Sequence, residues 1–195
     1  MSKEDLPRKE ANVLRGHEGA VLAARFNRNG EYCLSCGKDR TIRLWNPHRG
    51  LHIKTYKSHG REVRDVHVTP DNSKLCSCGG DRQVFYWDVA TGRVIRKFRG
   101  HDSEVCLFVF SSCLNYLDWI AFEIKGFEVI GVYYTNNLLY FDTRSEYCFE
   151  LLVRIDEDLN CRSFFTQTVT SVSYHPKENC MITASVDGTI RVWAS

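Results

Sequence analysis

The chain has 195 residues, of which 43% are hydrophobic and 26% are charged, and its formal net charge is +2. This length and balance favour a soluble globular protein with a substantial core. The first ten residues, MSKEDLPRKE, lack an apolar stretch, and no uninterrupted run of about 20 apolar residues follows. We therefore expect neither a secretory signal nor a membrane-spanning helix, and we expect an intracellular protein.

A pattern recurs along the N-terminal half of the chain at intervals of 42 residues. His17, His59 and His101 begin three units, and Trp45 and Trp87 end the first two. Each complete unit places its Trp 28 residues after its His. A repeat of about 40–45 residues with this opening and closing is typical of a four-stranded propeller blade.

Each of the first two units contains four short runs with β-strand character. In the first unit these runs lie near residues 21–26, 32–35, 41–45 and 53–56, and clusters of Asn, Gly, Pro and Asp separate them. The second unit repeats the order, with turns at 70–73, 81–82 and 88–92. Such runs predict four antiparallel strands per unit.

The pattern fails after Val105. A continued third unit would have Ser or Thr at 119, Asp at 123 and Trp at 129, but the chain has Trp119, Glu123 and Val129. Residues 106–166 are aromatic and rich in cysteine, and we expect them to be irregular and not native blade sequence. The abrupt edges favour an altered transcript or gene model over a genuine insertion after an internal deletion.

The pattern resumes in residues 167–195, where Thr183, Asp187 and Trp193 repeat the earlier spacing. Phe165 stands where the His of this unit would be. A His, an Asp, a hydroxyl and an indole N–H can form a closed chain of hydrogen bonds that makes a blade rigid. We predict such a structural network from His17, Ser35, Asp39, Trp45, His59, Ser77, Asp81, Trp87, Thr183, Asp187 and Trp193.

His17, Ser35 and Asp39 are also the residue types of a hydrolase triad. Their recurrence with an attached indole favours a structural role, and we predict no catalytic residue. The chain also offers no phosphate-binding loop, HExxH motif or nucleophile elbow, so an enzyme is disfavoured.

These motifs resemble the WD-repeat β-propeller family, through stretches such as VLRGHEGAVLAARFN, CSCGGDRQVFYWDVATGRVIRKFRGH and SVSYHPKENCMITASVDGTIRVW. The resemblance implies an all-β, incomplete propeller: two full blades, a partial third and a C-terminal blade. Residues 1–105 form the N-terminal blades and 167–195 the C-terminal blade. Propellers use about 4–8 blades and the family resemblance implies about seven, so blades are missing here. Because Lys9 to Leu14 precedes the first unit and no fourth strand follows Trp193, we expect these ends to pair.

The resemblance also implies a non-catalytic scaffold for protein partners from a kinase cascade or, alternatively, from the spliceosome, in the cytoplasm and nucleus. A third possibility is an inactive truncated isoform. The implied partner-binding face holds the loops beside the structural His and Asp, where charged side chains suit protein recognition. Its candidate residues are Glu18, Lys38, Arg40, Arg61, Glu62, Arg82, Asp102 and Glu104.

Charge and cysteine content limit the other ligands. Residues 1–105 hold 20 Lys or Arg against 13 Asp or Glu, but no RNA-binding motif accompanies this excess, so direct nucleic-acid binding is not expected. Nine scattered cysteines favour reduced thiols. Cys33 and Cys36, or Cys76 and Cys78, could suggest zinc; because Cys36 and Cys78 occupy equivalent repeat positions in strand-like sequence, we predict no metal and no cofactor.

Overall fold

The structure is a computed structural model that describes residues 7, 9–99, 105–110, 119–125, 128–135, 138–142 and 169–195. These residues form sixteen β-strands and no helix. The strands make four antiparallel sheets of four strands each. In the described part of the chain, therefore, no helix could cross a lipid bilayer.

The first two repeat units each fold into one complete sheet with its strands in chain order, as predicted. The first blade consists of β2 (Val21–Phe26), β3 (Cys33–Gly37), β4 (Thr41–Asn46) and β5 (Leu51–Lys57). The second blade consists of β6 (Val63–Val68), β7 (Lys74–Gly79), β8 (Val84–Asp88) and β9 (Val94–Phe98). Every residue of β3 is buried, whereas most of β5 is exposed. The second strand of the first blade is therefore part of the core, and its last strand lies largely at the surface.

The two ends of the chain meet in one sheet, which we call the closure blade. It consists of β1 (Lys9–Arg15), β14 (Val169–Tyr174), β15 (Cys180–Ser185) and β16 (Thr189–Ala194), in the order β1-β16-β15-β14. Strand β1 runs antiparallel to β16, from the pair Lys9 and Ala194 to the pair Arg15 and Thr189. This confirms the predicted pairing of the two chain ends, and it satisfies the backbone groups along the edge of β16.

The fourth sheet differs from the sequence prediction. The segment after Val105 was expected to give a partial blade and irregular chain, but it contains β10 (Val105–Phe110), β11 (Trp119–Lys125), β12 (Glu128–Thr135) and β13 (Leu138–Asp142), paired in chain order. The physical reason is that these runs lack the repeat's motif residues yet are rich in aromatic and β-branched residues, which favour strands without it. Residues 143–168 lie outside the described part.

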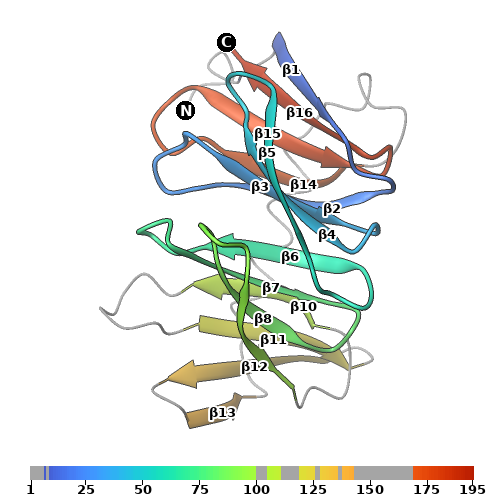
Figure 1. Cartoon of the computed structure of the whole chain (residues 1–195), viewed down its shortest axis with the longest axis vertical. Coiled ribbons are helices and arrows are strands. Elements are labelled where there is room, and N and C mark those ends of the chain that lie inside the picture. The colour runs from blue at the N-terminus through green and yellow to red at the C-terminus, as the bar shows by residue number, and fades with distance from the viewer. Residues whose placement is uncertain are drawn as a thin grey trace.

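The four sheets follow one another along the longest axis of the molecule, with the closure blade at one end and the β10–β13 sheet at the other (Figure 1). Strand β2 contacts β14 and β6, and β6 contacts β10, so the first strands of successive sheets lie side by side. One buried cluster joins the closure blade to the first blade, around Leu14, Trp45 and Ile182. A second joins the first and second blades, around Tyr56, Leu75 and Phe85.

Polar contacts also join neighbouring blades. Arg25 on β2 donates two hydrogen bonds, of 2.8 and 3.2 Å, to the carboxylate of Asp65 on β6. Burial alone would raise the pKa of Asp65, but His67 and Arg25 lower it to about 2. The ionised carboxylate therefore holds the two blades together where their first strands meet.

Candidate protein-interaction face

The polar network of the first blade links two strands, β3 and β4, to the loop before β2 and the turn after β3. His17 lies 2.8 Å from Asp39 through Nδ1 and 2.8 Å from Ser35 through Nε2. The Trp45 indole N–H donates to the same Ser35 hydroxyl at 2.8 Å. Because Trp45 uses an acceptor site of Ser35, the hydroxyl hydrogen is available to His17, and the His17 Nδ1–H can donate to Asp39.

The second blade repeats this network. His59 lies 2.8 Å from Asp81 and 2.7 Å from Ser77. The Trp87 indole N–H donates to Ser77 at 2.9 Å. The matching distances show that the repeat sets the side-chain geometry as well as the strand order.

The described residues of the closure blade include part of the network. The Trp193 indole N–H donates to Thr183 at 2.9 Å. The Asp187 carboxylate accepts from the backbone N–H of Thr189 at 2.8 Å and from its hydroxyl at 2.6 Å. The position of the missing imidazole belongs to Phe165, which lies outside the described residues, as does His101 of the third unit.

The networks stabilise the ionised form of their carboxylates. Burial would raise the pKa of Asp39, but the hydrogen bond and charge of His17, together with Thr41, hold it well below its ordinary value. Asp81 shows the same direction, because His59 and the backbone N–H groups of Gly60 and Gln83 offset its burial. Both Ser35 and Ser77 are fully buried and already bonded on two sides. The arrangement fixes strands and loops, and it leaves neither hydroxyl open to a substrate.

The candidate partner-binding residues lie in loops at one end of the blades. Val21 pairs with Gly37, and Thr41 pairs with Lys57, so the loops before β2 and after β3 and β5 share one end of the sheet. Glu18, Lys38, Arg40, Arg61 and Arg82 are exposed there, and Glu62 is partly exposed and paired with Arg64. Asp102 and Glu104 lie outside the described residues.

These loops are tightly tied to one another. In the first blade, the backbone N–H of Lys38 donates to the carbonyl of Ala20 at 2.9 Å, and in the second blade that of Gly80 donates to Glu62 at 2.9 Å. A Cβ atom on Gly79 would lie 2.1 Å from the Glu62 carbonyl oxygen, so only glycine permits this approach. The charged side chains therefore stand on a rigid base.

Two of the exposed arginines have an unusual backbone. Arg40 and Arg82 are 42 residues apart, occupy the same turn position of their blades, and have φ angles of 63° and 59°. The equivalent turn of the closure blade uses Gly188, with φ of 82°. In all three turns the residue's N–H donates to the carbonyl three residues earlier. The turn thus accepts glycine, the residue that adopts this conformation most easily.

A second inter-blade contact, which was not predicted from the sequence, also repeats. The Asn12 side-chain amide donates to the carbonyls of Pro47 and His48, at 2.9 and 3.0 Å. Lys54 reaches the carbonyls of Val89 and Ala90 in the next blade in the same way. Asn12 and Lys54 are 42 residues apart, so this spacing is the signal that could have revealed them. The two pairs tie the outer strand of one blade to a loop of the next.

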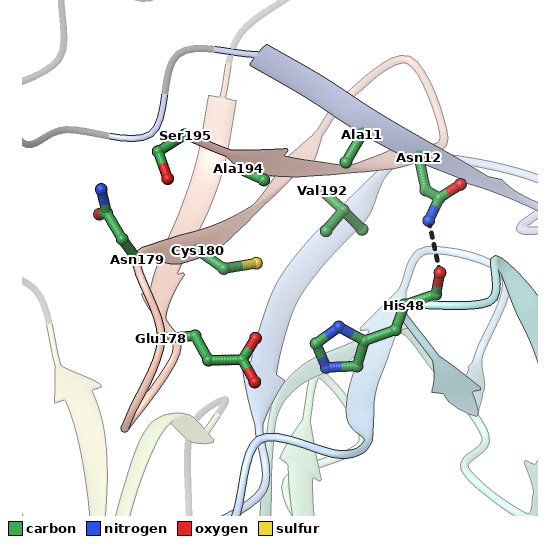
Figure 2. Close-up of a pocket in the computed structure, with 9 residues that line it drawn as sticks. All are labelled: Ala11, Asn12, His48, Glu178, Asn179, Cys180, Val192, Ala194 and Ser195. Carbon is green, nitrogen blue, oxygen red and sulfur yellow. Dashed lines mark hydrogen bonds between the residues drawn. The ribbon is translucent and has the colours of Figure 1, made fainter.

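A pocket of about 300 Å³ lies at the opposite end of the first and closure blades. Figure 2 shows Glu178 and the His48 ring facing each other across it. It is lined by Ala11, Asn12, His48, Glu178, Asn179, Cys180, Val192, Ala194 and Ser195.

Possible ligand atoms of His48, His175 and Glu178 lie within 4.8 Å of one another beside this pocket. However, Nδ1 of His175 accepts hydrogen bonds from the backbone N–H groups of Lys177 and Glu178, at 3.2 and 2.8 Å. The neutral ring therefore carries its proton on Nε2 and has no lone pair left for a metal.

The described cysteines at 33, 36, 76, 78 and 180 are free thiols, and burial raises the pKa of Cys33, Cys36 and Cys76.

Comparison with known proteins identifies relatives for parts of the chain. WD repeat domain-containing protein 83 of Xenopus tropicalis is 50% identical over 72 residues, which cover 37% of this chain and 23% of that protein. The Homo sapiens protein of the same name is 54% identical over 72 residues, with the same shares. The match thus spans about a quarter of the length of these relatives.

A solved structure supports the fold. The WD40 β-propeller domain of Doa1 aligns with a TM-score of 0.57 at 22% identity, covering 95% of this chain and 54% of that one. The family described as "WD domain, G-beta repeat" matches residues 8–46, 50–88 and 159–194, which together make up more than half of the chain. This chain belongs to the WD-repeat family.

Proposed function

We propose that this chain is a non-catalytic scaffold that holds protein partners on the loop end carrying Arg40 and Arg82. Membership of the WD-repeat family supports protein interaction in general. The hydroxyls of Ser35 and Ser77 are buried and hydrogen-bonded on two sides, so they make the blades rigid and are not available for catalysis. A rigid set of exposed charges suits recognition, because little loop freedom is lost when a partner binds.

The observation that carries the proposal is the positive φ of the two exposed arginines. A non-glycine residue in the left-handed region costs about 1–2 kcal/mol relative to its ordinary backbone conformations. Gly188 shows that the turn itself does not need a side chain there. An exposed guanidinium kept at this cost at two equivalent positions supports a role for the side chain in binding.

We assign the scaffold to mitogen-activated protein kinase signalling, in the cytoplasm and nucleus. Support comes from the resemblance of residues 8–105 and 167–195 to the mitogen-activated protein kinase organizer, a WD-repeat scaffold. The same resemblance supports the alternative, a protein-binding component of the spliceosome. Partners in both cases are proteins, and no small-molecule substrate or membrane is involved. An inactive truncated isoform is the competing proposal, because missing blades would remove part of a partner's binding surface.

The test is affinity purification of the full chain from cell extract, followed by quantitative mass spectrometry. Recovery of kinase-cascade components supports the signalling role, and recovery of spliceosomal proteins supports the alternative. The double variant Arg40→Gly/Arg82→Gly should lose these partners while folding normally, since glycine favours the same turn. Arg28→Gln/Arg49→Gln, which changes exposed arginines at the opposite end, is the control.

Two results would contradict the proposal. If the wild-type chain recovers no partner above the background of a mock purification, the inactive isoform is the better explanation. If both double variants recover partners equally, the partners do not bind the loop end that carries Arg40 and Arg82.

A further inference from the structure

Three differences between the second and first repeat units meet in space. Ser58 stands where the first unit has Gly16, Phe85 where it has Arg43, and Lys97 where it has Thr55, each 42 residues later. The Lys97 ammonium lies 4.5 Å from the centre of the Phe85 ring and 3.2 Å from the Ser58 hydroxyl oxygen. The three changes therefore form one local structure that the first blade lacks.

Phe85 holds this ammonium in place. One face of the ring stacks on the buried His59 at a centroid distance of 4.0 Å and an angle of 16°. Lys97 lies over the ring as a cation–π contact. In the first blade the corresponding Arg43 instead approaches Asp39, at 3.8 Å. Phe85, in the position of Arg43, thus removes a cation from the polar network of the second blade. Lys97 places another cation at the surface.

Within the described part of the chain, no carboxylate neutralises the charge of Lys97. Asp81 lies nearby in the blade but is occupied by His59, the Gly60 N–H and the Gln83 N–H. No acidic side chain lies within ion-pair distance of Lys97 among the residues that the structure describes. A positioned but unpaired cation is available for an anion supplied by a ligand.

The surroundings add positive charge and a second donor. Lys57, Arg61 and Arg99 are exposed next to this site in the chain, whereas Glu62 is paired with Arg64. Lys97 donates to the Ser58 oxygen, so the Ser58 hydroxyl hydrogen is free to point outward. A hydroxyl polarised by an ammonium is a strengthened donor.

We infer that Ser58 and Lys97 form an anion-binding subsite of the second blade, which takes a carboxylate or phosphate group from an acidic segment of a protein partner. The inference rests on the proposed function, because the subsite lies at the loop end assigned to partner binding. It names the chemistry of the partner: an anionic group accepts from the Lys97 ammonium and from the Ser58 hydroxyl, while the neighbouring basic side chains attract the segment.

The test is a fluorescence-anisotropy titration of the full chain with a labelled oligoglutamate peptide at about 0.05 M and 0.15 M salt. Lys97→Gln and Ser58→Ala should each weaken binding by about three- to tenfold, as expected for loss of one charge-assisted hydrogen bond at an exposed site. Arg49→Gln, which removes one exposed positive charge at the opposite end, should change the affinity less than twofold. Melting curves establish that each variant is folded.

Three further arms decide the outcome. A peptide with phosphoserine in place of glutamate distinguishes phosphate from carboxylate as the bound group. Whichever peptide binds more tightly, a loss of its affinity in Lys97→Gln supports the subsite. Equal effects of Lys97→Gln and Arg49→Gln overturn it. Tighter binding of a single-stranded RNA, lost in the Lys97 variant, overturns the choice of a protein partner. If partner recovery depends on Arg40 and Arg82 but Lys97→Gln leaves the peptide affinity unchanged, this inference is overturned while the proposed function stands.

Discussion

The first and second blades and the closure blade are held together by different means. In the two full blades, an imidazole connects a buried serine to an aspartate, so one polar network crosses the sheet. The closure blade has Phe165 at the corresponding position of the sequence, and its described residues include the Thr183–Trp193 and Asp187–Thr189 contacts of the network. It gains instead a strand from the other end of the chain. Local polar chemistry and chain topology are thus two separate ways to fix a blade.

The largest effect should come from breaking the topological contact. Leu14 is 1% exposed and anchors β1 in the cluster with Trp45 and Ile182. Replacing it with alanine should destabilise the protein by about 2–4 kcal/mol through lost burial and a residual cavity. Urea unfolding measures this loss, and hydrogen exchange should show early opening of β16. Lys9→Ala, at the exposed start of the same strand, is the control and should change little.

The next effect separates the full networks from the partial one. Asp39→Ala or Asp81→Ala leaves an imidazole and turn N–H groups without an acceptor, which should cost about 1–3 kcal/mol. Because the sequence has Phe165 in place of the histidine of this unit, Asp187→Ala should cost less. Thermal unfolding of the three variants tests the order. Equal losses at positions 39, 81 and 187 would show that the imidazole contributes nothing to the difference.

The networks should also make stability depend on pH. The folded-state pKa of Asp39 and of Asp81 is lowered, so their contribution is complete above the unfolded value of about 4 and is lost as the pH falls below it. The midpoint of unfolding should therefore drop between about pH 5 and pH 2, and the double variant Asp39→Ala/Asp81→Ala should show a shallower drop. A parallel pH profile for wild type and variant would contradict this assignment.

The smallest effect concerns the turns that the three blades share. Arg40→Gly should leave stability unchanged or raise it by about 0.5 kcal/mol. The free-energy cost of a positive φ at a non-glycine residue is removed, and this gain exceeds the cost of the larger conformational entropy that glycine has in the unfolded chain. Gly188→Arg in the closure blade is the reverse change and should lower stability. Calorimetry can resolve both shifts, and a marked loss in Arg40→Gly would mean that the Arg40 side chain supports the fold.

The residues of one repeat unit were sufficient to predict much of this molecule. The recurrence of His17, Ser35, Asp39 and Trp45 at fixed spacing predicted four strands per unit and the network partners, because each contact lies within one unit and depends on local register. The unpaired strand edges, together with the family resemblance, predicted that Lys9 to Leu14 pairs with the end of the chain at Trp193, since an unpaired edge requires a partner.

Other features depended on tertiary structure, because they join residues whose spacing carries no motif. The contact of Arg25 with Asp65 and the approach of Lys97 to Ser58 form only when two blades or two strands pack together. The strands β10–β13 show that loss of the repeat motif does not remove the tendency to form a sheet. By itself, the sequence determined the blades and their internal hydrogen bonds, which are local. Packing decided the buried and charged contacts that join the blades, such as that of Arg25 with Asp65, and which described charges remain unpaired, since burial and ion pairing depend on neighbours distant in the chain.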